Sequence, residues 1–439
     1  MPLKILITGD LHLGRRSTRL PPEWADDRRF AASSAWEAAV DRALALAVDV
    51  VVLTGDLIDR ENRFYEARGP LEAGLTRLEA AGIDTVAVAG NHDFDVLPRL
   101  ASLLGLSRFH LLGAGGTWQR LAVERGGETV LFDGWSFPRE RVTADPLDLY
   151  DLPAAGPAPI LGVVHGDLGA AFSPYAPLSR AKLAAKPVTA WLLGHIHMPL
   201  RLASDGPLML YPGSPQAFDP GETGVHGAWL LTLEGRRIAE VEQLPLSSVR
   251  YETLAIDLGD AADREGFERR WSAALYRALD GAVTAGGERF GLLVARLELA
   301  GRTALAGRLT PWLTDLQSQT ELTHGAARAR VDAVRDGTRP PVELAELDGH
   351  RDALGALAGL LLALDRGEVP PLLLRRTLEQ LQSAYFARGY SGLAGGSEPD
   401  ESTARETLRT AGGRLLEALL AQREALGERP APPSEDRGP

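Results

Sequence analysis

Five short apolar runs in the amino-terminal half of the chain each end in a cluster of aspartate, asparagine or histidine. In chain order they read LKILITGDLH (3–12), VDVVVLTGDLID (48–59), DTVAVAGNHD (84–93), PILGVVHGDL (159–168) and AWLLGHIH (190–197). Helical patterns at 30–47 and 69–82 separate the first three runs. Continuously apolar strands that alternate with helices are typical of a sheet covered by helices. The sequence therefore predicts an α/β layered domain whose site lies at the carboxyl ends of these strands.

The pattern changes twice after residue 200, which indicates further domains. Strand, helix, strand, helix and strand patterns alternate from near Arg250, and the pattern is helical from Pro340 onward. The final segment has too little apolar surface to form a packed structure. We therefore expect a first domain at 1–248, a small α+β domain at 249–338, a helical region at 339–427 and a disordered tail at 428–439.

The composition and the apolar pattern of the chain argue against several kinds of site and several classes of protein. The chain has no cysteine, which excludes disulfides, thiolate metal sites and cysteine nucleophiles. Its longest apolar stretch, 354–364, is shorter than the roughly 20 residues that cross a bilayer. The opening residues lead into a strand rather than a signal peptide, so we expect a soluble cytoplasmic protein with no membrane partner. The net charge of −12 argues against a protein that coats nucleic acid without specificity.

The polar ends of the five runs supply a mixed set of side chains. They are Asp10, His12, Asp56, Asp59, Asn91, His92, His165, His195 and His197. A single histidine is more often structural than a metal ligand, but five strand ends of this kind rarely occur by chance. Carboxylate, imidazole and amide groups together suit Mn²⁺, Fe²⁺ or Zn²⁺. The residues alone leave open whether His195 and His197 would bind one ion or two.

The ordered pattern GDLH, GDLIDR, GNHD, VVHGD and GHIH resembles the signature of the calcineurin-like metallophosphoesterase superfamily. The resemblance implies a two-sheet β-sandwich flanked by helices, here followed by a small α+β cap domain and carboxyl-terminal helices. It also implies two divalent metal ions, about 3.5 to 4 Å apart, that stabilise both the attacking and the leaving oxygen of an in-line phosphoryl displacement.

The resemblance assigns a role to each of these residues. The first ion would be held by Asp10, His12, Asp56 and His197. The second ion would be held by Asp56, Asn91, His165 and His195. Asp56 would bridge the two ions, and a hydroxide shared between them would be the nucleophile. His92 would act as the general acid toward the leaving group, supported by Asp59.

Three further features are similar to the SbcD type of DNA repair exonuclease within that superfamily. They are DLHLGRR with the long segment 17–43, the turn YPGSPQAFDPGE at 211–222, and the order of cap domain and helices. This resemblance implies a Mn²⁺-dependent DNA nuclease that trims double-stranded ends and cuts single strands or hairpins. It also implies a homodimer through helices near 30–47 or 69–82, and docking on an SMC-like ATPase of the SbcC type.

The helical pattern at 402–426 carries a leucine stripe with two equally good interpretations. The stripe consists of Leu408, Leu415, Leu416, Leu419 and Leu420. It would either bind a partner or fold back on the chain's own cap.

Arginines near the first two motifs are expected to contact DNA phosphates. Arg15, Arg16 and Arg19 follow the first motif, and Arg60 follows the second. A surface ion pair is an equally good interpretation of Arg60. The chain has only three lysines, so the arginine clusters also fit a general preference for arginine. Two alternative functions stay open: a small-molecule phosphodiesterase or phosphatase with the same site, and a catalytically silent scaffold or DNA-end-binding subunit.

Overall fold

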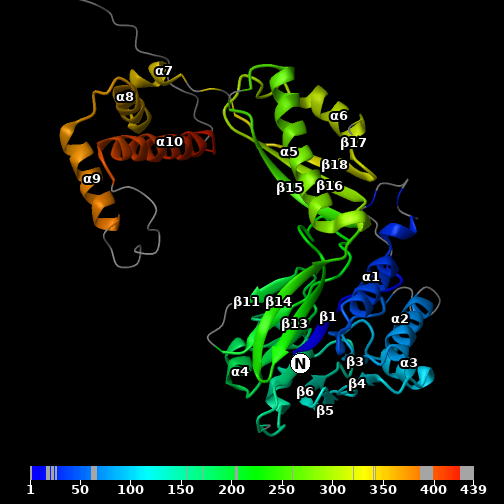
Figure 1. Cartoon of the computed structure of the whole chain (residues 1–439). Helices are drawn as coiled ribbons and strands as arrows, with labels where there is room; N and C mark the ends of the chain where they lie inside the picture. The colour runs from blue at the N-terminus through cyan, green and yellow to red at the C-terminus, as the bar shows by residue number, and fades with distance from the viewer. Residues whose placement is uncertain are drawn as a thin grey trace, which may run out of the picture. The chain divides into compact units, whose positions relative to one another are not determined.

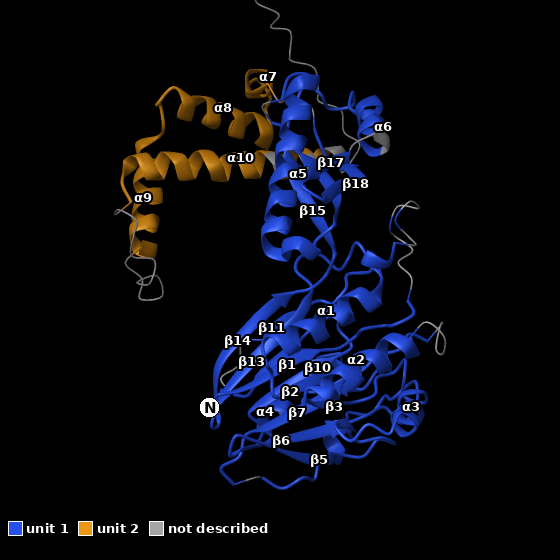
Figure 2. Ribbon diagram, turned by 45° about the vertical axis from the view of Figure 1, so that its right-hand side comes forward, with its two compact units in different colours: residues 1–339 blue, residues 340–439 orange. Residues whose placement is uncertain are grey.

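The computed structural model of the chain covers most of its length. It describes residues 2–15, 20, 24, 27–60, 67–154, 156–170, 172–202, 206–259, 261–319, 321–339, 341, 343–385 and 399–425. The tail expected to be disordered, 428–439, lies outside these residues. The chain divides into two compact units, residues 1–339 and 340–439, which Figure 2 shows in different colours. No helix in the described ranges is long and apolar enough to cross a membrane.

Two six-stranded sheets form the first part of unit 1 (Figure 1). The first sheet has the order β14 (Arg237–Pro245), β13 (Gly227–Glu234), β1 (Leu3–Thr8), β2 (Val50–Leu53), β3 (Asp84–Ala87) and β4 (Phe109–Leu111). The second has the order β11 (Leu200–Leu202), β12 (Leu208–Tyr211), β10 (Ala190–Gly194), β7 (Ile160–His165), β6 (Glu128–Trp135) and β5 (Gln119–Arg125). A short pair, β8 (Asp167–Leu168) and β9 (Pro177–Leu178), follows β7 along the chain.

The two sheets pack face to face through aliphatic side chains. Ile5, Val52 and Val86 of the first sheet belong to one buried cluster with Val163 and Leu192 of the second. Strands β1 to β4 are mutually parallel, as are β6, β7, β10 and β12. Parallel strands bring their carboxyl ends to the same edge of a sheet. The polar ends of the five apolar runs therefore converge.

Helices cover the outer face of the first sheet. They are α1 (Ala32–Ala45), α2 (Arg68–Ala80) and α3 (Leu97–Leu104), and α4 (Arg180–Ala185) lies against the second sheet. Trp36 of α1 is fully buried, and its indole nitrogen donates a hydrogen bond to the Pro70 carbonyl of α2 at 3.0 Å. Gly74 of α2 lies under this indole, so the two helices approach closely. Two 3₁₀ helices, Arg28–Phe30 and Pro146–Leu149, complete this part.

A third sheet follows within unit 1. Its order is β15 (Val249–Asp257), β16 (Leu292–Ala300), β18 (Ala327–Asp336) and β17 (Glu321–His324). Helices α5 (Arg264–Gly286) and α6 (Thr310–Gln319) pack on one face, and a 3₁₀ turn lies at Gly287–Arg289. Trp24 and Phe30 pack with Tyr251 and Val294 of this sheet. The segment after the first polar motif therefore contacts the third sheet.

Unit 2 is helical over its described residues. It contains α7 (Leu344–Asp348), α8 (Ala353–Asp365), α9 (Pro371–Tyr385) and α10 (Glu401–Ala425). Within the α10 stripe, Leu416 is buried, and Leu408, Leu419 and Leu420 pack against the same core, whereas Leu415 is exposed. Most of this stripe therefore packs on α8 and α9 of its own unit. The expected fold class is confirmed: a two-sheet sandwich with helices, an additional sheet and carboxyl-terminal helices.

Candidate metal centre

All nine predicted site residues come together where the strands of the two sheets end. Asp10 and His12 follow β1, Asp56 and Asp59 follow β2, Asn91 and His92 follow β3, His165 ends β7, and His195 and His197 follow β10. Each of the nine lies within hydrogen-bond, ion-pair or ring-contact distance of at least one other. The site therefore combines residues from both sheets.

Four of these residues adopt a left-handed backbone conformation. Among the described residues other than glycine, six have a positive φ, and Asp10, His12, Asp56 and His195 are four of them, at 47°, 44°, 50° and 99°. Such conformations cost energy and persist where the surrounding structure enforces them. Here the amide of Asp10 donates to the Gly55 carbonyl at 2.9 Å, and the amide of His12 donates to the Asp56 carbonyl at 3.0 Å. These bonds join the loops after β1 and β2, which carry three of the four residues.

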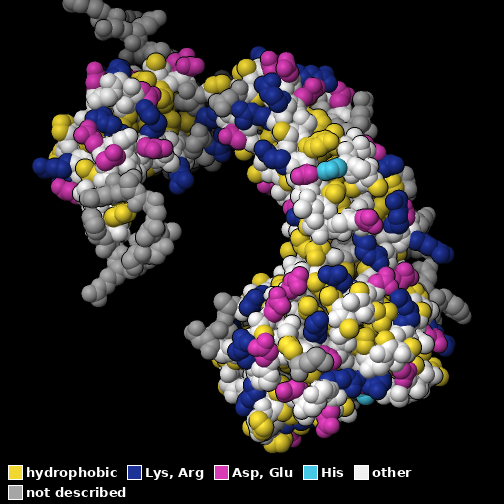
Figure 3. All heavy atoms as spheres, in the orientation of Figure 1, with side chains coloured by type: hydrophobic (Ala, Val, Ile, Leu, Met, Phe, Trp, Pro, Cys, Tyr) yellow, Lys and Arg dark blue, Asp and Glu magenta, His cyan; other side chains and the backbone are white. Residues whose placement is uncertain are grey.

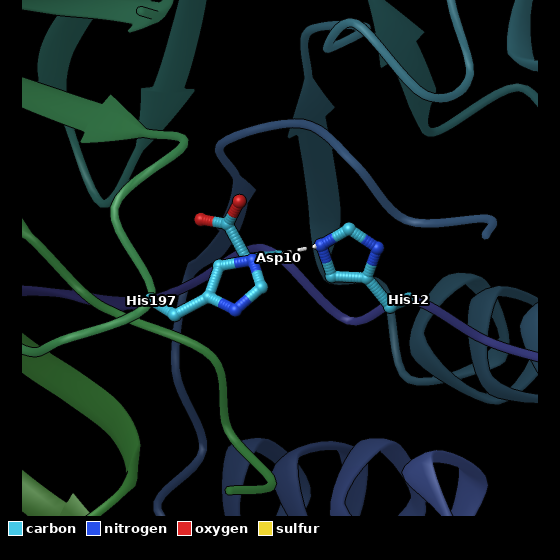
Figure 4. A group of neighbouring side chains, drawn as sticks. All are labelled: Asp10, His12 and His197. Atoms are coloured by element: carbon cyan, nitrogen blue, oxygen red, sulfur yellow. Dashed lines mark hydrogen bonds between the residues drawn. The ribbon is translucent and has the colours of Figure 1, made fainter. Parts of the chain in front are cut away.

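The first group of converging side chains consists of Asp10, His12 and His197 (Figure 4). The Nε2 atoms of His12 and His197 face each other at 3.0 Å, beside the carboxylate of Asp10. Asp10 is fully buried and accepts the backbone N–H of His195 on both oxygens, each at 3.1 Å. Burial raises the pKa of Asp10, and the nearby His165 and His197 oppose this effect.

The second group surrounds Asp56 and His165. Asp56 Oδ2 lies 3.3 Å from His165 Nε2 and 4.0 Å from His12 Nε2, so Asp56 contacts members of both groups. His165 Nε2 also lies 3.2 Å from Asn91 Oδ1, while its Nδ1 is 3.0 Å from the Thr54 carbonyl. Burial opposes charge on His165, but the charge and hydrogen bond of Asp56, together with Asp10 and the Thr54 carbonyl, outweigh it and raise the pKa of His165 to about 9.

His195 and His92 complete the cluster. The ring of His195 lies 5.4 Å from that of His165, and burial together with the His165 charge lowers the pKa of His195 to about 3. His92 places its ring 4.8 Å from the His12 ring, and its backbone N–H donates to Asp56 Oδ1 at 2.8 Å. Burial lowers the pKa of His92, against the attraction of Asp56 and Asp59. Asp59 Oδ2 itself lies 3.3 Å from His12 Nδ1, so this carboxylate is close to a predicted ligand as well.

The donor set fits divalent cations. The cluster contains three overlapping groups of three residues whose ligand atoms lie within 4.8 Å of one another inside each group. They are Asp10, His12 and His197; His12, Asp56 and His92; and Asp10, Asp56 and His165. Each group contains two or three buried residues. The contacts found for Asp10 and Asp56 in the described part of the chain are to histidines and backbone amides. Buried carboxylates require compensating positive charge. Divalent cations at these groups would supply it, with donors that Mn²⁺, Fe²⁺ and Zn²⁺ accept.

Glycines in the motifs allow this close approach of loops. A Cβ atom on Gly90 would lie 2.2 Å from Asp56 Oδ1. A Cβ atom on Gly194 would lie 2.1 Å from the Thr54 carbonyl oxygen and 2.5 Å from His165 Nδ1. The glycines of GNHD and GHIH are therefore required by packing around the cluster.

The predicted arginines have different surroundings. The guanidinium of Arg15 lies 4.9 Å from the centroid of the Phe218 ring, and that ring is 6.5 Å from the ring of His12. Arg15 is therefore held beside the cluster by a cation–π contact. Arg60 pairs with Glu140 at 2.5 Å on the surface, which matches the ion-pair interpretation. Arg16 and Arg19 lie outside the described residues.

Two residues with no role predicted from the sequence support the cluster. Asp93 is fully buried and accepts the backbone N–H groups of Leu57 at 2.7 Å and Gly90 at 2.8 Å, which ties two motif loops together. Burial raises the pKa of Asp93 to about 7. Glu222 lies 2.7 Å from Nδ1 of His197. In the sequence, Asp93 is the fourth residue of the GNHD motif, and Glu222 is the acid that ends YPGSPQAFDPGE.

Comparisons with known proteins match the part of the chain that holds the site. Residues 3–199 match the family model described as calcineurin-like phosphoesterase. The uncharacterized metallophosphoesterase YhaO of Bacillus subtilis is 26% identical over 288 residues, which cover 64% of this chain and 68% of that protein. The DNA double-strand break repair protein Mre11 of Haloferax volcanii is 30% identical over 281 residues, which cover 61% of this chain and 56% of that protein.

Solved structures that match part of the chain include a dimetal phosphatase from Danio rerio. It has a TM-score of 0.36 and 17% identity, and the match covers 56% of this chain and all of that one. A 5′-nucleotidase precursor from Thermus thermophilus has a TM-score of 0.36 and 18% identity, with 55% of this chain and 54% of that chain covered. Because residues 3–199 match this family and hold buried aspartate and histidine groups that could bind metal, we identify them as a calcineurin-like metallophosphoesterase domain.

Proposed function

We propose that this metal-dependent phosphoesterase is a DNA nuclease that uses two divalent ions, with Mn²⁺ as the metal. The observation that carries the phosphoester chemistry is Asp56, whose carboxylate lies between histidines of the two converging groups. The distant similarity to Mre11 supports DNA as the substrate. The activity proposed is exonucleolytic trimming of double-stranded ends, together with cutting of single strands or hairpins.

The residues divide the chemistry among them. Asp10, His12, Asp56 and His197 would hold one ion, and Asp56, Asn91, His165 and His195 the other. When bound, the ions would polarise phosphate oxygens and supply a water of lowered pKa at neutral pH. His92 would hold the proton that the leaving oxygen takes up, because its ring lies beside the cluster while its backbone is fixed by Asp56. Asp59, in this proposal, favours the protonated form of His92.

Two features at the edge of the cluster favour a nucleic acid. Arg15 is held over Phe218, where its charge can meet a phosphate. Phe172 is fully exposed in the turn after β8, and three residues later the ring of Tyr175 lies 5.1 Å from that of His195. The exposed ring of Phe172, in the same loop as Tyr175, would offer a stacking surface for an unpaired base. Figure 3 shows acidic and basic side chains interspersed on one face, so DNA contacts would be local to the site.

Partners form a further part of this proposal. The exposed leucines Leu372 of α9 and Leu415 of α10 are available to an SMC-like ATPase of the SbcC type. A homodimer would form through α1 and α2. Both statements depend on the SbcD resemblance of the chain.

The test compares substrates in the presence of Mn²⁺. End-labelled linear duplex, hairpin and single-stranded DNA are digested with and without the candidate ATPase, beside bis-p-nitrophenyl phosphate. Metal-dependent cleavage of DNA supports the nuclease, and activity on the small ester with none on any DNA would overturn it. Asp56→Asn is the matched control, expected to remove both activities. An Asp56→Asn protein that behaves like the parent in every assay would instead indicate a silent scaffold.

A further inference from the structure

The loop between β12 and β13, residues 212–226, lies directly against His197; we name it the support segment. Ser214 donates its backbone N–H to the His197 carbonyl at 2.9 Å. Gly213, with φ of +75°, passes so close that a Cβ atom there would lie 2.5 Å from the same carbonyl oxygen. The backbone of His197 is therefore held by a turn that only glycine allows.

The same segment also holds the ring of His197 through Glu222. Glu222 Oε1 lies 2.7 Å from His197 Nδ1. Its other oxygen, Oε2, accepts the backbone N–H of Phe218 at 2.8 Å and the hydroxyl of Ser214 at 3.3 Å. Glu222 is only 8% exposed, so both oxygens are committed to these partners.

This contact determines which nitrogen of His197 carries a proton. A carboxylate accepts hydrogen bonds, so Nδ1 of His197 is the nitrogen that carries hydrogen and donates it to Glu222. The lone pair is then on Nε2, the atom that faces His12 Nε2 at 3.0 Å beside Asp10. Carboxylates in this position orient a ligating histidine and raise its basicity toward a metal.

The second converging group has a different support. His165 Nδ1 lies 3.0 Å from the backbone carbonyl of Thr54, which is a neutral acceptor. The support segment also places Phe218 against the ring of His12. Among the described contacts, the support segment thus touches two histidines of the first group. Its charged hydrogen-bond acceptor, Glu222, contacts His197.

We propose that Glu222 is a positioning residue that sets the metal affinity of the first group, Asp10, His12 and His197, independently of the group around His165. This inference rests on the proposed two-metal site. It predicts that loss of the Glu222 charge weakens one of the two metal-binding events and leaves the other unchanged.

The experiment measures metal binding by the full-length chain rather than its activity. Metal-free protein is titrated with Mn²⁺ by calorimetry, and bound Mn²⁺ is counted after gel filtration. The parent should bind two ions. Glu222→Gln should weaken one of them by roughly 10- to 100-fold with the other unchanged. His197→Ala, which removes the ligand itself, should lose that same ion.

Controls separate this role from a structural one. Asp219→Asn introduces an amide into the same segment, where the Asp219 side chain caps the Gly221 N–H at 2.9 Å, and should bind both ions like the parent. Glu222→Asp keeps the charge with a shorter reach and should give an intermediate affinity; it is titrated in place of Glu222→Gln if that variant does not fold. Equal weakening of both ions, or unchanged binding, would overturn the role of Glu222 alone. A parent that binds fewer than two ions would overturn the two-metal proposal, and this inference with it.

Discussion

Asp56 makes more contacts within the cluster than a simple ligand would need. Its carbonyl accepts the His12 amide, Oδ1 accepts the His92 amide, and Oδ2 lies 3.3 Å from His165 Nε2. Opposite charges on the surrounding histidines lower the pKa of its carboxyl despite complete burial. One residue therefore links three strand ends, and its charged form is stable at neutral pH.

Replacement of His92 should separate metal binding from catalysis. His92 contacts Asp56 through its backbone, which an alanine retains, so His92→Ala should keep two ions. The loss of a proton donor should reduce phosphodiester cleavage by about 10²- to 10⁴-fold. Metal content and turnover measured on the same sample check this. His110→Ala is the control, because His110 pairs with Asp84 away from the cluster; undiminished turnover by His92→Ala would contradict the assigned role.

Replacement of Phe172 should affect DNA and not small esters. The exposed ring makes Phe172→Ala neutral for folding, while the loss of stacking should raise KM for single-stranded DNA by roughly tenfold. Phe172→Trp should keep the parent's KM, since stacking is retained. Steady-state kinetics on DNA and on bis-p-nitrophenyl phosphate give the comparison, with the exposed Tyr276→Ala in α5 as control. An unchanged KM for DNA in Phe172→Ala would count against a base-stacking role.

At the scale of elements, the packing of α1 on α2 depends on a glycine that the sequence pattern alone does not explain. A Cβ atom on Gly74 would lie 2.3 to 2.6 Å from atoms of the buried Trp36 indole. Gly69 of the same helix has no atom within 4 Å of such a Cβ. The two glycines therefore differ in tertiary contact and not in helix propensity.

Alanine substitutions at these glycines should have opposite effects. Gly74→Ala gains about 1 kcal/mol of helix propensity but forces a shift of the indole that costs about 1 to 3 kcal/mol, so we expect a net loss of stability. Gly69→Ala should be neutral or stabilising by up to about 1 kcal/mol. Urea unfolding of both variants measures the difference. Equal stability of the two would show that α1 and α2 do not pack as described.

At the scale of the whole molecule, the cluster lies entirely within unit 1. The nine site residues and the support segment fall between residues 10 and 226, and unit 1 extends to residue 339. Unit 2 has its own buried leucine core. The chemistry and the proposed contacts with an ATPase therefore belong to separately packed parts of the chain.

A chain shortened after Arg339 should keep its hydrolytic site. We expect it to bind two Mn²⁺ ions and to hydrolyse bis-p-nitrophenyl phosphate at the parent's rate, because unit 1 has a complete core. Association with an ATPase partner should be lost, since the exposed leucines of α9 and α10 are removed. Turnover and co-elution check the two outcomes. A folded shortened chain without hydrolysis would show that unit 2 contributes to the site.

Local patterns in the sequence predicted the main elements and the polar side chains that gather at the strand ends. The helices expected at 30–47 and 69–82 correspond to α1 at 32–45 and α2 at 68–80. They could be predicted because their apolar periodicity extends over more than two turns. The site residues could be predicted because polar side chains after apolar strands are visible without knowledge of strand order. The sequence alone did not reveal the roles of Asp93 and Glu222, since a single acid in a loop has no periodic signal.

By itself, the sequence determined which side chains stand at the strand ends and that they suit divalent metals. Tertiary structure decided how they meet: His12 and His197, 185 residues apart, face each other only because strands of two sheets end at the same place. It also decided that four site residues are strained and that Glu222 orients His197. Residue type and spacing are local properties, whereas distance and hydrogen-bond direction between loops depend on the packing of the whole sandwich.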